Sequence, residues 1–154
     1  MKKKQASPKQ ILNRRARHDY ELGDSLVVGL SLTGGETKAL RMGHGHLRGA
    51  YVTVKDGELW LLNATIVGTR GVQIDEQTQT RSRKLLARRR EINHLIEAKQ
   101  QGRTIVPMAM LTQGRFIKLR IAIGKGRKLH DKRQTIKARD EARTMSAAIK
   151  HHVR

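Results

Sequence analysis

Residues 51–62 read Tyr-Val-Thr-Val-Lys-Asp-Gly-Glu-Leu-Trp-Leu-Leu, two apolar runs separated by an Asp-Gly pair. A tight turn between antiparallel strands needs a positive φ at its central residues, and Asp-Gly supplies it at little cost. This stretch therefore predicts a β-hairpin, with strands over 51–54 and 59–62.

Further strands are predicted on both sides of this hairpin. Residues 26–32 alternate apolar side chains with small or polar ones, which is the period of a half-buried strand, and residues 64–67 continue the β pattern. Residues 104–111 and 116–123 form a second hairpin around Gln113-Gly114. About six strands with short helices at their ends indicate a mainly β fold, a small closed barrel. A flat α+β sheet is the alternative, because a pattern alone does not determine topology.

Three short helices are predicted around these strands. The first covers residues 11–17, and the second covers 36–42 and ends at Gly43. The third covers 83–101, where Leu85, Ile92 and Ile96 form one apolar stripe ahead of Gly102.

The charge of the chain points to an anionic partner. Its 154 residues, enough for one domain, carry 33 Lys and Arg against 13 Asp and Glu, a net charge of +20. Such an imbalance makes a compact protein repel itself unless a polyanion lies nearby, and nucleic acid fits better than a membrane surface or an acidic protein. Because aromatic residues make up only 3% of the chain, we expect contact with phosphates and with RNA shape, not base stacking on aromatic side chains.

Other classes of protein fit the composition poorly. No apolar run approaches the ~20 residues of a membrane span, and the basic start of the chain does not resemble a secretory signal. The absence of cysteine excludes disulfides and thiol chemistry and suits the cytoplasm, where we expect the protein to act. We expect no enzyme activity, because no nucleophile or acid pair stands in a catalytic context.

Two motifs that resemble a metal site and a phosphate-binding loop lack the residues that those sites need. His44 and His46 flank one glycine but lack further ligands at a suitable spacing, so we expect a polar loop and no metal. Residues 124–128, Gly-Lys-Gly-Arg-Lys, lack the spacing of a phosphate-binding loop and are expected to be a hinge. We expect no cofactor.

The chain divides into three parts by charge and apolar content. Residues 1–10 are a flexible basic N-terminus, and 11–128 are an RNA-binding β domain. Residues 129–154 are a basic tail whose apolar residues are too sparse to bury a face, so we expect it to be mostly unfolded alone and helical only on a partner.

The densest basic cluster lies at residues 81–90, Arg-Ser-Arg-Lys-Leu-Leu-Ala-Arg-Arg-Arg. It can be a solvated face of the predicted helix 83–101. Because like charges so close together repel one another unless phosphates lie nearby, RNA contact is favoured.

Five blocks in order resemble the SsrA-binding protein family, also called small protein B. They are Asn13-Arg14-Arg15-Ala16-Arg17-His18-Asp19-Tyr20; Gly35-Glu36-Thr37-Lys38-Ala39-Leu40-Arg41; Tyr51-Val52 with Asp56-Gly57-Glu58; Arg83-Lys84-Leu85-Leu86 with Arg90-Glu91-Ile92; and Gly124-Lys125-Gly126-Arg127-Lys128-Leu129-His130-Asp131-Lys132-Arg133. The ordered set is far more specific than any single block.

The resemblance implies an oligonucleotide-binding-type barrel that binds transfer-messenger RNA and delivers it to stalled ribosomes in trans-translation. It implies that the tail folds as a helix in the decoding centre and the empty messenger channel of the small subunit, and that the protein is a monomer on its RNA. The alternatives are a basic barrel-type ribosomal or translation-factor-like protein, which would lack the 130–133 block, and an RNA-processing enzyme, which would need a catalytic set.

The resemblance also implies two groups of site residues. The RNA-binding candidates are Asn13, Arg14, Arg17, His18, Glu36, Lys38, Arg41, Arg83, Lys84, Leu86 and Arg88. The tail candidates for the ribosome are Lys128, His130, Asp131, Lys132, Arg133, Lys137, Arg139 and Arg143.

The chain departs from the family pattern at a few of these surfaces. Val27 stands where the family often has Glu, Arg88 where Asn or His is common, and residues 43–49 are richer in glycine. These departures suggest a divergent member whose RNA surface differs in detail.

Overall fold

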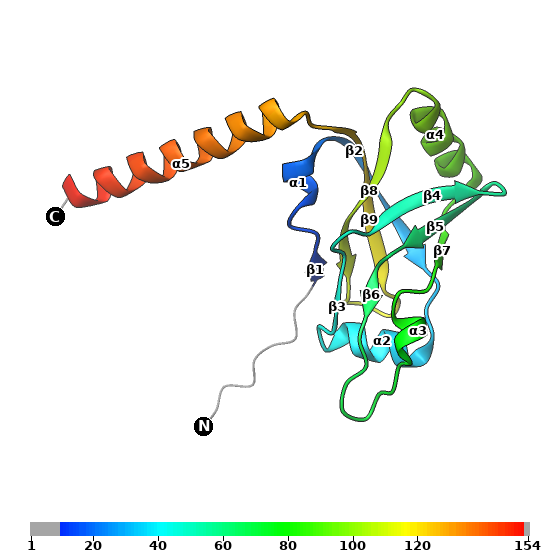
Figure 1. Ribbon diagram of the computed structural model, residues 1–154. Coiled ribbons are helices and arrows are strands. Elements are labelled where there is room, and N and C mark those ends of the chain that lie inside the picture. Colours follow the sequence, from blue (N-terminus) through cyan, green and yellow to red (C-terminus); the bar gives the residue numbers. More distant parts are fainter. Residues whose placement is uncertain (1–9, 153–154) are drawn as a thin grey trace.

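The computed structural model describes residues 10–152, and the side chains within that range except those of residues 129–131 and 151–152. Its elements follow the chain from a short N-terminal strand to a long C-terminal helix (Figure 1). They are β1 (Gln10–Leu12), α1 (Ala16–Asp19), β2 (Tyr20–Leu30), α2 (Gly34–Arg41), β3 (Gly45–His46), β4 (Tyr51–Lys55), β5 (Glu58–Leu62), β6 (Thr65–Ile66), α3 (Glu76–Gln79), β7 (Arg83–Leu86), α4 (Arg89–Gln100), β8 (Thr104–Leu111), β9 (Lys118–Gly126) and α5 (Leu129–His152).

The predicted Asp-Gly hairpin is confirmed. β4 and β5 pair antiparallel from Tyr51↔Leu62 to Lys55↔Glu58. The two turn residues between them, Asp56 and Gly57, have φ values of 53° and 72°. Positive φ at both central positions is the turn geometry whose twist matches that of the flanking strands.

Six strands of the described chain close into a ring. The order of hydrogen-bonded neighbours is β8-β4-β5-β7-β2-β9, and β9 pairs back to β8 in the second predicted hairpin. β1 extends the ring along β8, and β3 pairs with β6 in a separate small sheet. The fold is therefore mainly β with a ring of strands, and the flat-sheet alternative is wrong because β8 and β9, the two ends of this order, pair with each other.

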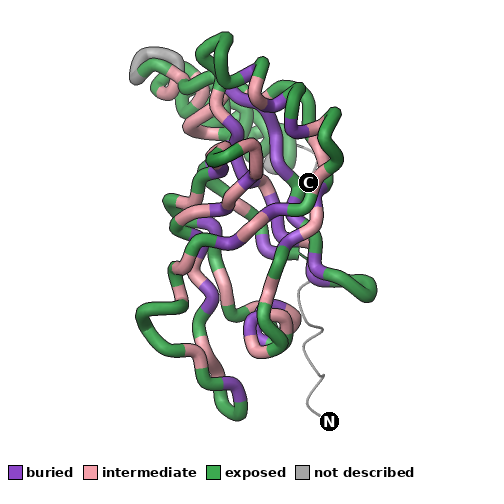
Figure 2. Tube along the Cα trace, turned by 90° about the vertical axis from the view of Figure 1, so that its right-hand side faces the viewer, coloured by how far each residue is buried: buried purple, intermediate pink, exposed green. Residues whose placement is uncertain are grey.

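The ring encloses an apolar core to which most of its strands contribute. Leu59 and Leu61 of β5, Leu85 of β7, and Leu119 and Ile121 of β9 are all fully buried. Lys118 and Arg120, which alternate with the buried residues of β9, are exposed as predicted. Buried residues gather in the middle of the molecule and exposed ones on its protruding loops (Figure 2).

Two of the predicted helices need correction. Residues 11–17 do not form one helix: β1 runs to Leu12 and pairs with β8, and α1 begins only at Ala16. Residues 83–86 form strand β7, and the helix after them, α4, begins at Arg89. Leu85 and Ile92 are seven residues apart, which fits one face of a helix. Residues 83–86 nevertheless form a strand, because they pair with β5 on one side and β2 on the other, and their side chains alternate between the two faces of the sheet.

Helix α5 stands away from the strand ring (Figure 1). Among the described residues, its contacts with the β domain are at its first turns, where it meets α1. Ile136, Met145 and Ile149 along it are 44%, 69% and 64% exposed, so the part of the helix whose side chains are described, residues 132–150, has no buried apolar face.

Candidate RNA interface

Helix α1 presents basic side chains from a corner that is fixed to β8. Asn13 donates from its side-chain nitrogen to the Pro107 carbonyl at 2.9 Å, and its backbone N–H donates to the Met108 carbonyl at 2.8 Å. Ala16 is buried beneath the helix, while Arg14 and Arg17 are exposed. Asn13 therefore holds the corner in place, and the two arginines are the groups open to phosphates.

His18 is held by its neighbour. Its Nδ1 lies 3.0 Å from Oδ1 of Asp19, an arrangement that orients the ring. This hydrogen bond is the main reason that the pKa of Asp19 is lowered, with Lys132 as a further cause. His18 is half-buried, and among the described residues its other ring nitrogen has no hydrogen-bonding partner, so it can contact RNA from a fixed orientation.

Glu36 is part of a buried charge network and not of the surface. Its carboxylate accepts from the Arg81 guanidinium at 2.7 and 2.8 Å and from Arg83 at 2.9 and 3.1 Å. It also caps α2 through the Thr33 backbone N–H at 3.0 Å. Burial alone raises the pKa of Glu36, but the hydrogen bonds from Arg81, Thr33 and Arg83 outweigh it, so the pKa is lowered.

Arg83 occupies the same buried site. It has no exposed side-chain surface, and it also donates to the Ala64, Thr78 and Gln79 carbonyls. In this structure the side chains of Glu36 and Arg83 are turned inward, so they offer almost no exposed surface for the direct RNA contact that the sequence led us to expect. Both residues act in folding, where they fasten α2, β7 and the loop before β7 to one another.

Arg41 is also engaged by the protein. Its guanidinium donates to the Thr112, Gly114 and Arg115 carbonyls at 3.3, 2.9 and 3.0 Å, and so holds the turn between β8 and β9. Lys38, on the same helix, is exposed. Because α2 and α4 lie at opposite ends of the ring, Lys38 is far from the basic residues near α4 (Figure 1).

A second basic area lies where β7 leads into α4. Leu86 is 55% exposed, and Val27 beside it on β2 is 43% exposed. Lys84 lies 3.5 Å from the Glu58 carboxylate, and Arg88 is exposed. These residues line one shallow hollow, which we call the β7 hollow.

The joint between the ring and the tail was not foreseen from the sequence. The Asp19 carboxylate forms an ion pair with the Lys132 ammonium at 3.3 Å. The Asp19 backbone carbonyl accepts from the backbone N–H of Arg127 at 2.9 Å. The Arg127 guanidinium also donates to the Thr135 hydroxyl at 2.7 Å. In the sequence, the only indication of this contact was Asp19, an acidic residue within the basic block 13–20.

The tail residues expected to contact the ribosome differ in their exposure and in their contacts with the protein. Lys132 is paired at the joint, whereas Lys128, Arg133, Lys137, Arg139 and Arg143 are exposed. Lys137 approaches Glu141 at 4.0 Å, a weak surface pair. The side chains of His130 and Asp131 lie outside those described.

The described residues offer little for other chemistries. Their His, Asp and Glu side chains form no group of three that could hold a metal ion. Among the described helices, none combines the length and apolarity that crossing a membrane requires.

Comparison with known proteins assigns the family. A model of the SmpB protein family matches residues 10–151. The SsrA-binding protein of a Nostoc species is 42% identical, covering 91% of this chain and 92% of that protein. The SsrA-binding protein of Chlamydia caviae is 43% identical over 95% and 99%.

A solved structure agrees with these matches in fold. A chain from "tmRNA-SmpB: a journey to the center of the bacterial ribosome" superposes with a TM-score of 0.65 at 33% identity, covering 79% of this chain and 87% of that one. The family model runs from β1 into the tail. The chain therefore belongs to the SmpB protein family.

Proposed function

We propose that this protein binds transfer-messenger RNA and delivers it to ribosomes stalled without a stop codon. The observation that carries the proposal is that similarity to SsrA-binding proteins runs over nine-tenths of the chain, through both the ring and most of the tail. A ribosomal or translation-factor-like role is less supported, because it accounts for the basic ring and not for the tail. We propose no catalytic step, and we place the protein beside the ribosome in the cytoplasm.

The strand ring serves, in this proposal, as an oligonucleotide-binding-type barrel. Its closure by the β8–β9 pairing and its apolar interior support that interpretation. Two areas of its surface carry exposed or half-exposed basic residues: the α1 corner with Arg14, Arg17 and His18, and the β7 hollow with Lys84 and Arg88. We assign the transfer-messenger RNA to these areas.

Helix α5 serves the ribosome. Its exposed cations, Arg133, Lys137, Arg139 and Arg143, suit the phosphates of a messenger channel, and its lack of a buried face suits a segment that needs a partner. His130 and Asp131, at the start of the tail, would meet the decoding centre.

We expect the tail helix to be only partly populated in the free protein. An isolated helix with no buried stripe is marginal in water. Removing residues 130–154 should therefore lower the circular-dichroism signal at 222 nm by much less than the 24 residues of α5 would supply. A loss equal to that full helix would show that the tail folds without its partner.

We expect binding of transfer-messenger RNA to weaken steeply with salt. Each neutralised phosphate adds about −0.7 to −0.9 to the slope of log K against log salt. Replacing Arg17 with Gln should make the slope shallower by about one such step, whereas Arg70→Gln, an exposed arginine in the loop between β6 and α3, should not. Titrations at several salt concentrations measure this. A flat response of the wild-type protein would contradict the phosphate contacts, and failure to bind this RNA at low salt would contradict the proposed function.

A further inference from the structure

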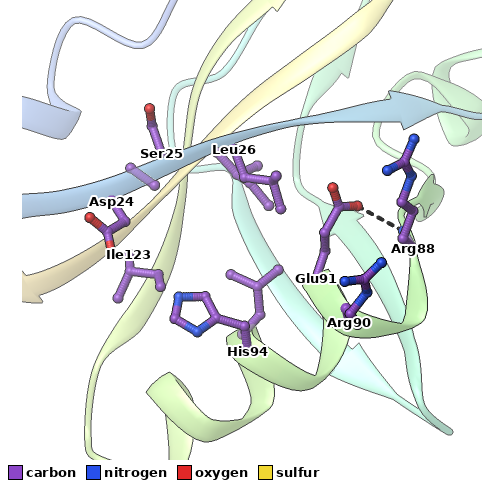
Figure 3. Close-up of a pocket in the computed structure, with 11 residues that line it drawn as sticks. Asp24, Ser25, Leu26, Arg88, Arg90, Glu91, His94 and Ile123 are labelled. Atoms are coloured by element: carbon purple, nitrogen blue, oxygen red, sulfur yellow. Dashed lines mark hydrogen bonds between the residues drawn. The ribbon is translucent and has the colours of Figure 1, made fainter.

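A second hollow lies beside α4 and shares Arg88 and Glu91 with the β7 hollow. It lies between α4 and the strands β2 and β9, and its volume is about 440 Å³ (Figure 3). Ligand sites of proteins have volumes of roughly 300–1,000 Å³. The hollow is therefore large enough for one nucleotide.

The floor of the hollow is apolar. Leu95 of α4 and Ile121, Ala122 and Ile123 of β9 are buried there, and Leu26 of β2 is half-buried. Such a floor makes close contact with the face of a planar ring and removes it from water. It can hold a nucleobase without an aromatic side chain.

An irregularity in β2 places Asp24 at the edge of this floor. Leu22 pairs with Gly124 and Ser25 pairs with Ala122, so Gly23 and Asp24 together stand opposite Ile123. A bulge of this kind redirects a side chain and is common beside functional sites. His94 comes from α4 on the facing wall (Figure 3). Among the side chains that the structure describes, neither Asp24 nor His94 has a hydrogen-bonding or ionic partner within the protein.

The charges around the rim separate the possible ligands. The carboxylates of Asp24 and Glu91 disfavour a bare phosphate in the middle of the hollow, and Arg88 and Arg90 disfavour a basic peptide side chain. A nucleotide carries a hydrogen-bond donor on its base and a negative charge on its phosphate, which suit the carboxylates and the arginines of the rim. Carboxylates accept from the amino groups of bases, and guanidinium groups bind phosphates.

We propose that this hollow binds one unstacked nucleotide of the bound RNA. Its base lies on the floor with an amino group toward Asp24, and its phosphate lies on the other side of the hollow by Arg88 and Arg90. Arg88 and Glu91 also line the β7 hollow, so a strand of RNA on that surface reaches the new site without a break. The inference rests on the proposed function and adds a subsite that reads a base.

Replacing Asp24 distinguishes a specific base contact from non-specific electrostatic attraction between the basic protein and RNA. Removing an acid from a protein that binds a polyanion ordinarily tightens binding. At Asp24 the site predicts the opposite, because an acceptor for the base is lost. Asp24→Ala should weaken binding of transfer-messenger RNA by about 10- to 100-fold, on the order of one hydrogen bond to a charged group. Glu97→Ala, which removes the same charge from an exposed residue of α4 outside the hollow, should leave binding unchanged or tighter.

A second pair of variants tests the facing wall without a change in acidic charge. His94→Ala should weaken binding, whereas Asn93→Ala, at the adjacent exposed position outside the hollow, should not. Thermal unfolding of all four variants checks that they remain folded at the temperature of the binding assay.

A direct probe uses the full chain and nucleoside monophosphates. Methyl resonances of Leu26, Ile121 and Ile123 should shift on addition of AMP, CMP or GMP, and less with UMP, which has no amino group. The methyls of Leu40 and Ile66, buried outside the hollow, should not shift. The subsite would be overturned if Asp24→Ala bound transfer-messenger RNA as tightly as the wild-type protein or more tightly, and if the methyl resonances did not shift. The proposed function would remain intact in that case, because the wild-type protein would still bind the RNA. Normal RNA binding with weaker ribosome binding in Asp24→Ala would assign the hollow to a protein partner instead.

Discussion

A chain ending at Leu129 is expected to bind transfer-messenger RNA as tightly as the full chain and to leave peptides on stalled ribosomes untagged. The strand ring holds its shape through its own core, and among the described residues the contacts of α5 with the rest of the protein lie in the first turns of that helix. Removing the tail therefore leaves the RNA surface intact while it deletes the segment assigned to the decoding centre. The fraction of stalled peptide that acquires the tag in reconstituted translation should fall to background, and the Kd for the RNA should not change. Equal losses of binding and tagging would contradict a protein with two separable contacts.

A matched pair of substitutions asks whether the tail acts as a helix or only as a carrier of charge. Ala142 is exposed in the middle of α5. Ala142→Pro should break the helix at a cost of about 3 kcal/mol and should strongly reduce tagging without any change in charge. Ala142→Ser, at the same position, costs only a few tenths of a kcal/mol and should leave tagging nearly intact. Equal tagging by the two variants would show that charge alone suffices.

The largest expected effect on stability follows from replacing Glu36 with Ala. The substitution leaves the Arg83 guanidinium, which has no exposed surface, without its counter-charge. Breaking a buried ion pair from one side costs about 3–5 kcal/mol. Urea unfolding should show that loss as a lower midpoint at an unchanged slope. Glu97→Ala, at an exposed position of α4, should change the free energy of unfolding by less than about 0.5 kcal/mol.

The same network predicts how stability depends on pH. The pKa of Glu36 is lowered in the folded protein from an ordinary value of 4.5, so the ionised carboxylate stabilises the fold above pH 4.5. That stabilisation is lost as the pH falls through the lower, folded pKa, because protonation removes the charge that Arg83 requires. The difference in unfolding free energy between the wild type and Glu36→Gln should be constant near neutral pH and should shrink below pH 4.5. A difference that grows on acidification would contradict the ion pair.

The Glu36 network also shows where reasoning from sequence reached its limit. Glu36 and Lys38 stand two residues apart in one block, and the block as a whole was assigned to RNA. The structure buries Glu36 against Arg81 and Arg83, which are 45 and 47 residues away, and leaves Lys38 exposed. Arg41, which the sequence also places among the RNA-binding candidates, holds the turn after β8 through the Gly114 and Arg115 carbonyls. A charged side chain does not reveal from its neighbours in sequence whether a distant partner will neutralise it.

Helix α4 and strand β7 illustrate the same limit at the level of elements. Gly102 correctly marked the end of the helix, since a glycine with positive φ follows it. The start was placed too early, because Leu85 fitted the stripe of Ile92 and Ile96 equally well. What makes residues 83–86 a strand is the hydrogen bonding offered by β5 and β2, and those strands are distant in the chain.

The order of turns and alternating runs was sufficient to predict the two hairpins, the mainly β fold and the separate basic tail. These features depend on interactions between residues a few positions apart, such as the positive φ of Asp56 and Gly57. Packing decided three features: the choice of a closed ring over a flat sheet, the inward turn of Glu36 and Arg83, and the hollow where the β2 bulge meets α4. Each of these joins residues that are brought together only when the strands pair. Local pattern determines which segments form elements, and long-range pairing determines which charges remain free to meet RNA.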